Sequence, residues 1–124
     1  MLKDQARKVN DICIVDCTGE VDLSSSTQLR EALVKALNSE VASVLVNMTG
    51  VSYIDSSGIA TLLEGLQLSN KTQKRFGLYG LRKNARSVLG LARLDRVFCI
   101  WESEQEAVEK VPSTQPWAGL QGVR

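Results

Sequence analysis

Residues 43–66, with the sequence SVLVNMTGVSYIDSSGIATLLEGL, decide the fold class of the chain. The first part, Ser43 to Met48, is apolar and rich in β-branched residues, which is typical of a buried strand. The segment Asp55-Ser56-Ser57-Gly58 then begins a helix, because apolar residues follow it at helical spacing, namely Ile59, Leu62, Leu63 and Leu66. A strand, a short turn and an amphipathic helix in succession predict an α/β domain.

The same alternation continues on both sides of this stretch. Upstream, the run around Ile12, Ile14 and Cys17 predicts a strand, and residues 3–9 predict an earlier partner strand that turns at Asn10-Asp11. Downstream, the spacing of apolar residues predicts a strand at 76–79, a helix at 82–91, a strand at 97–101 and a last helix that ends near Val111. The sheet is therefore parallel or mixed, with the N-terminal strands free to pair antiparallel.

Two capping boxes mark where helices begin. Ser25-x-x-Gln28 precedes the first amphipathic helix, and Ser103-x-x-Glu106 precedes the last one, which Pro112 ends. We therefore expect one domain over residues 1–111. Residues 112–124 are expected to form a flexible tail, with Trp117 as its only anchor.

Length and composition limit the class of protein. The chain has 124 residues, 44% of them hydrophobic and 23% charged, which fits one globular domain. The sequence has no apolar run near the roughly 20 residues of a membrane-spanning helix, and residues 1–10 lack the apolar segment of a signal peptide. We therefore expect a cytoplasmic protein without a membrane span.

The residue types exclude much catalytic chemistry. Histidine is absent, which removes the Ser-His-Asp and Cys-His nucleophile pairs and the imidazole metal ligand. The three cysteines have no CxxC spacing, so neither a disulfide framework nor a zinc site is predicted. We expect no enzyme activity, no metal and no cofactor. A serine-based enzyme stays open as an alternative, and it would need a lysine base near Ser57.

Positive charge gathers in residues 71–96. This window holds eight bases and one acid, although the whole chain has a net charge of only +1. A solvated helix face is the favoured interpretation, and an acidic protein partner or an anionic membrane surface are alternatives. Direct nucleic-acid binding is disfavoured, because aromatic residues make up only 5% of the chain and no recognition motif accompanies the charge.

The turn into the second helix is the main candidate site. The first N–H groups of a helix lack partners within the helix, so a phosphate on Ser57 would lie where anions are favoured. Gly58 is expected to leave the backbone beside Ser57 open to a partner or a kinase, and Asp55 is expected to cap the helix. The alternative is that residues 55–57 only cap. A second candidate is the turn Gly19-Glu20-Val21-Asp22, since sites gather at the C-terminal ends of strands.

Three stretches resemble one family, the STAS domains of anti-sigma factor antagonists. ICIVDCTGEVDLSSSTQLREAL resembles the family's opening, VLVNMTGVSYIDSSGIATLLEG its phosphorylation-site motif, and VLGLARLDRVFCIWESEQEAV its closing helix, strand and helix. The resemblance covers residues 10–111, and the Asp-Ser-Ser-Gly segment is its most specific part. It implies a four-to-five-stranded mixed sheet packed with about four helices on one face.

The resemblance also implies site residues. The family's phosphorylated serine precedes the glycine, which is Ser57 here. The residues implied to bind a partner are those of the two turns: Asp22, Ser24, Asp55, Ser56, Ser57 and Gly58.

The function implied is that of a bacterial partner-switching protein. In its unphosphorylated form the chain would bind an anti-sigma factor, itself a serine protein kinase, and so free a sigma factor. Phosphorylation at Ser57 would switch it off, and a PP2C-type phosphatase would reset it. The alternative that stays open is a STAS docking subunit of a transporter or stress-sensing complex, which would use the basic window.

Overall fold

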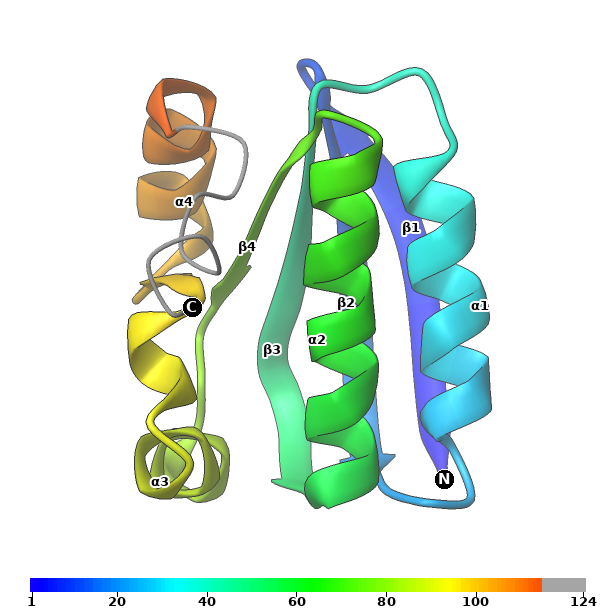
Figure 1. Cartoon of the computed structure of the whole chain (residues 1–124), viewed down its shortest axis with the longest axis vertical. Helices are drawn as coiled ribbons and strands as arrows, with labels where there is room; N and C mark the ends of the chain where they lie inside the picture. The colour runs from blue at the N-terminus through cyan, green and yellow to red at the C-terminus, as the bar shows by residue number, and fades with distance from the viewer. Residues whose placement is uncertain (115–124) are drawn as a thin grey trace.

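Five strands form a single mixed sheet in the computed structural model of the chain, which describes residues 1–114 (Figure 1). The strands are β1 (Leu2–Val9), β2 (Ile12–Val21), β3 (Ser43–Ile54), β4 (Arg75–Tyr79) and β5 (Cys99–Trp101). The helices are α1 (Ser26–Leu37), α2 (Ser56–Lys71), α3 (Lys83–Leu91) and α4 (Glu104–Lys110), with 3-10 turns at Leu94–Arg96 and Val111–Ser113.

The strand order follows the chain order, β1-β2-β3-β4-β5. β1 pairs antiparallel with β2, and every later pair is parallel. This arrangement confirms the α/β mixed sheet and the early partner strand that the sequence predicts.

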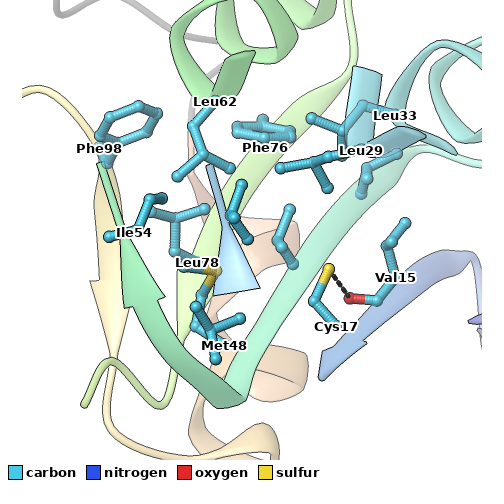
Figure 2. Packing of buried hydrophobic residues seen from close by; sticks show 14 of the residues in the cluster. Val15, Cys17, Leu29, Leu33, Met48, Ile54, Leu62, Phe76, Leu78 and Phe98 are labelled. Atoms are coloured by element: carbon cyan, nitrogen blue, oxygen red, sulfur yellow. Dashed lines mark hydrogen bonds between the residues drawn. The ribbon is translucent and has the colours of Figure 1, made fainter. Parts of the chain in front are cut away.

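The main core lies between the sheet and helices α1, α2 and α3. Figure 1 shows α1 and α2 side by side in front of the sheet. In Figure 2, Leu29 and Leu33 of α1 and Leu62 of α2 point into one cluster with Phe76 of β4. Alternate residues of β2 and β3 face this cluster, which is why the two central strands are apolar on this side.

Helix α4 departs from the expectation that the helices share one face. Its Ala107, with the following Val111, packs on the opposite face of the sheet, against the side chains Ile12, Ile14, Leu45 and Tyr79. These strand residues alternate with those that face α1 and α2. The central strands are thus covered on both faces, as their continuous apolar runs require.

A polar network lies beside α4 on this second face. Arg7 of β1 donates to both carboxylate oxygens of Asp16, at 2.7 and 3.2 Å, and also to Glu104 of α4. The Asn47 amide donates to Asp16 at 2.7 Å, and the Tyr79 hydroxyl donates to Glu104 at 2.9 Å. The network therefore ties β1, β2, β3 and β4 to the last helix.

The two carboxyl groups of this network make its contribution depend on pH. Burial alone would raise the pKa of Asp16, but the hydrogen bonds from Arg7 and Asn47 outweigh it and the net pKa is lowered. The hydrogen bond from Arg7, followed by the bond from Tyr79, lowers the pKa of Glu104. Because both values lie below those of the unfolded chain, the stabilisation is complete above about pH 5 and is lost as the pH falls through the folded-state values.

We expect Arg7→Met to lower the free energy of unfolding by about 1–2 kcal/mol at pH 7, discounted because the partners are about one-third exposed. The difference from wild type should shrink below about pH 4, as the carboxyl groups become protonated. Urea unfolding at pH 7 and at pH 3.5 measures both values. Arg30→Met is the matched control, since Arg30 forms an exposed ion pair with Glu64 and its loss should change stability by less than about 1 kcal/mol. A constant difference across pH would contradict the expectation.

The two predicted capping boxes have different outcomes. At α4 the serine half forms, because Ser103 Oγ accepts the Glu106 N–H at 3.2 Å, but the Glu106 carboxylate accepts the N–H of Glu102, one residue before the N-cap, at 3.1 Å. The box at α1 is wrong. Ser25 occupies the N-cap position without a side-chain cap bond, and the Gln28 amide instead donates to the Leu2 carbonyl at 3.0 Å.

The last described residues remain against the domain. Pro112 lies in the 3-10 turn that follows α4, and Arg75 Nε donates to the Thr114 carbonyl at 2.6 Å. The rest of the predicted tail, including Trp117, lies outside the described residues.

Candidate functional site

The two turns predicted as site candidates lie at the same edge of the sheet. β2 and β3 run parallel, with Glu20 opposite Tyr53 and Val21 opposite Ile54, so both strands end together. The Asp55 N–H donates to the Val21 carbonyl at 3.1 Å and joins the two ends directly. In Figure 1 this edge lies at the bottom, where α2 begins and the chain leads from β2 into α1. β2 extends to Val21, so the second turn begins at Asp22, later than predicted.

Helix α2 begins with its three polar residues in different roles. Asp55 is the N-cap, and its Oδ1 accepts the N–H groups of Ser57 at 2.9 Å and Gly58 at 3.3 Å. This confirms Asp55 as the cap and satisfies two of the free donors at the helix start. Ser56 is exposed and Ser57 is half-buried. Within residues 1–114 the Ser57 hydroxyl has no hydrogen-bond partner, so the cap does not depend on it.

Gly58 allows α2 to pack closely on the strands and does not open the backbone to a partner. It is buried, and a Cβ at this position would lie 2.6 Å from Ile54 Cγ1 and 2.8 Å from the Val21 carbonyl oxygen. The start of α2 therefore rests directly on the ends of β2 and β3, which only glycine allows. This differs from the expectation that Gly58 exposes the backbone to a partner, because the position that a side chain would occupy faces the interior.

Asp22 organises the other turn. Its Oδ1 accepts the Ser24 N–H at 3.0 Å and the Ser24 hydroxyl at 2.6 Å, and its backbone carbonyl accepts the N–H groups of Ser25 and Ser26. Hydrogen bonds from Ser24, and then Ser25, lower the pKa of the Asp22 carboxyl group. Ser25 Oγ donates to the Glu20 carbonyl at 2.8 Å. The turn is thus closed by its own side chains.

Asn84, which sequence reasoning missed, connects the basic window to this edge. Its Oδ1 accepts the Ile54 N–H at 2.9 Å, directly before the cap residue Asp55. The start of α3, with exposed Arg82 and Lys83, is thereby fixed to the end of β3. A polar residue on the buried side of a short helix is the signal that could have identified it.

Most of the basic window is solvated, as expected. Six of its eight bases are exposed: Lys71, Arg82, Lys83, Arg86, Arg93 and Arg96. Lys74 donates to the Ser39 carbonyl and Arg75 to that of Thr114, so these two bases serve the fold. Arg86 forms an ion pair with Glu102 at 2.6 Å.

The described residues hold no group of three or more His, Cys, Asp or Glu that could bind a metal ion. Cys13, Cys17 and Cys99 are free thiols, and burial raises the pKa of all three, that of Cys17 to about 12. No helix within residues 1–114 is long and apolar enough to cross a bilayer.

Comparison with known proteins identifies one family. The sequence model of the STAS domain matches residues 4–107. Among solved structures, an anti-sigma factor antagonist from Mycobacterium paratuberculosis aligns with a TM-score of 0.82 and 19% identity, over 90% of this chain and 95% of that one. The phosphorylated form of the Bacillus cell fate determinant SpoIIAA aligns with 0.69 and 22%, over 88% and 99%.

A sulfate transporter family protein from Wolinella succinogenes also aligns, with a TM-score of 0.73 and 14% identity, over 86% of this chain and 89% of that one. At these identities the likeness to all three structures is one of fold.

Proposed function

Because the chain belongs to the STAS domain family, we propose that it is an anti-sigma factor antagonist. In its unphosphorylated form it binds an anti-sigma factor with serine kinase activity and so frees a sigma factor. Phosphorylation of Ser57 by that kinase ends the complex, and a PP2C-type phosphatase restores binding. The chain itself acts as a binding protein and catalyses no reaction.

One observation carries this proposal: Ser57, whose hydroxyl has no hydrogen-bond partner among residues 1–114, lies at the second position of α2, beside the Asp22 turn. A hydroxyl in this place can be modified without loss of the cap, because Asp55 alone supplies the cap. A phosphate there is also compatible with the helix, since the positive end of the helix dipole favours an anion.

The physical effect of the phosphate is then on docking. It adds nearly two negative charges beside Asp55 and close to the Asp22 turn. A partner that covers this edge would have to remove water from the phosphate next to two carboxylates, and that cost opposes the complex. The partner-binding set proposed here comprises both turns: Asp22, Ser24, Asp55, Ser56, Ser57 and Gly58, with Gly58 acting through the position of the helix.

The test is a capture experiment from host lysate, followed by a phosphorylation assay. Wild-type bait should retain an anti-sigma factor kinase identified by mass spectrometry, and that kinase with ATP should modify the chain at Ser57. Ser57→Ala should abolish the modification, whereas the matched variant Ser56→Ala should keep it. Modification at Ser56, or a kinase that ignores both serines, would overturn the proposed switch.

A second candidate function is a docking subunit of a transporter or stress-sensing complex. The observation that favours it is the group of exposed bases at α3, Arg82, Lys83 and Arg86. The proposed serine switch does not involve these residues. Retention of the same transporter or stress-complex subunits by wild-type and Ser57→Asp baits would support this function instead. Those contacts should weaken as salt rises, since they depend on exposed charge.

A further inference from the structure

Large hydrophobic side chains gather at the edge that carries Ser57. Within residues 1–114 five such side chains are more than one-third exposed: Met1, Leu23, Val34, Tyr53 and Leu91. Leu23 follows Asp22 in the turn after β2, and Tyr53 lies opposite Glu20, near the end of β3. Met1 precedes Leu2, which pairs with Gly19 of β2. Three of the five therefore lie at the same end of the sheet.

Leu23 is the most exposed large hydrophobic side chain of the two turns. It is 79% exposed, whereas Tyr53 is 43% exposed. The backbone on both sides of Leu23 is fixed, because Asp22 accepts the N–H groups of Ser24, Ser25 and Ser26 through its side chain or its carbonyl. A side chain displayed on a fixed backbone loses little conformational entropy when a partner covers it.

The carboxylates of Asp22 and Asp55 are directed toward the backbone. Oδ1 of Asp22 binds within its own turn, and Oδ1 of Asp55 binds the first N–H groups of α2. What the turns offer to a partner is then the Leu23 side chain, the Tyr53 ring and the serine hydroxyls. Burial of the apolar area of Leu23 and Tyr53 would contribute affinity to such a contact.

We infer that Leu23 is the anchor of the docking edge and inserts into an apolar pocket on the anti-sigma factor, with Tyr53 beside it. The inference rests on the proposed function and specifies the chemistry of its contact. It also explains the direction of the switch. A phosphate on Ser57 would lie beside a contact that is apolar around Leu23, and removing water from the phosphate there opposes the complex.

The test compares two leucines in the same chain. Leu23→Ala should weaken binding of the anti-sigma factor by at least about tenfold, as expected for an anchor residue. The matched control is Leu91→Ala, because Leu91 is 87% exposed at the end of α3 and should leave the dissociation constant within about twofold. Leu23→Met should restore most of the affinity, because it returns a large apolar side chain to the same position. Calorimetric titration measures each value.

The outcomes separate this inference from the function on which it rests. If wild type binds the anti-sigma factor and Ser57→Asp does not, but Leu23→Ala binds like wild type, the anchor is overturned and the function stands. If wild type binds no anti-sigma factor, the function is overturned, and the anchor with it. Equal losses from Leu23→Ala and Leu91→Ala would also overturn the anchor. Thermal unfolding should be unchanged in both variants, since neither side chain is buried.

Discussion

A Ser57→Asp chain is expected to bind the anti-sigma factor at least about a hundredfold more weakly than wild type, a loss of about 3 kcal/mol. The added carboxylate lies beside the Asp55 cap and the Asp22 turn, and a covering partner would have to desolvate it. Ser57→Ala should bind as tightly as wild type and should resist the kinase, because it removes only a hydroxyl that makes no hydrogen bond within the described part of the chain. Surface plasmon resonance with the purified anti-sigma factor gives the three dissociation constants.

Ser56→Asp is the matched control for this measurement. Ser56 belongs to the same proposed partner-binding set but is more exposed than Ser57, so a carboxylate at position 56 should lose less of its hydration in the complex and should cost less than about tenfold in affinity. Neither variant should unfold more easily, since an acidic residue in the first turn of a helix is favourable. Equal affinity for wild type, Ser57→Ala and Ser57→Asp would contradict the switch, and equal losses at positions 56 and 57 would reduce it to a general charge effect.

The second large effect is expected from Gly58→Ala, which should lower the free energy of unfolding by about 2 kcal/mol. Its new Cβ would lie 2.6 Å from Ile54 Cγ1, 2.7 Å from Val21 Cγ1 and 2.8 Å from the Val21 carbonyl oxygen. That oxygen also accepts the Asp55 N–H, so α2 can move away only if this link is strained. Overpacking of this kind costs about 1–3 kcal/mol or more, which exceeds the gain in helix propensity from glycine to alanine.

Gly90→Ala provides the matched comparison in a second helix. Gly90 lies in α3, and a Cβ there would meet no atom within 4 Å. The propensity gain is then unopposed, so this variant should be more stable than wild type by up to about 1 kcal/mol. Guanidinium unfolding of both variants measures the free energy of unfolding, which should fall for Gly58→Ala and rise for Gly90→Ala. A neutral or stabilising Gly58→Ala would show that the contact between α2 and the strand ends is loose.

Periodicity was sufficient to predict most of the fold, because apolar residues recur at helical or strand spacing on most elements. The spacing of Ile59, Leu62 and Leu66 identified α2, and the β-branched run at 43–48 identified β3. Strand ends were harder to predict. β3 continues to Ile54 through polar and glycine residues, since its pairing with β2 includes register shifts near Thr18 and Glu20.

Tertiary contacts explain what the sequence could not predict. Ser25 and Gln28 have the spacing of a capping box, but Gln28 reaches the Leu2 carbonyl of a strand 26 residues away. The network around Arg7 was missed because its members are distant in the chain. The sequence nevertheless indicates such a network, since Asp16 and Asn47 interrupt two apolar strands, and the two residues lie opposite each other in the sheet. A charged residue inside such a run requires a partner.

The candidate site was more predictable than its surroundings, because a cap and a helix start are local features. Asp55 and the two turns could be placed together from strand order alone. The inward role of Gly58 could not, because it depends on how closely α2 approaches β2. The acceptor of the Ile54 N–H could not be assigned to Asn84 either, since this role depends on the position of α3 relative to Ile54.

The identity of strand order and chain order bears on how this domain forms during translation. Each strand joins the strand that precedes it in the chain, so the sheet can grow by successive addition, first across the turn after β1 and then through crossovers that contain a helix. The bond between Arg7 and Glu104 departs from this rule, since it spans 97 positions. Until α4 is synthesised, Ile14 and Leu45 lack their cover and Arg7 lacks one of its two carboxylates. A nascent chain halted before residue 104 should therefore be the species most exposed to chaperones and proteases.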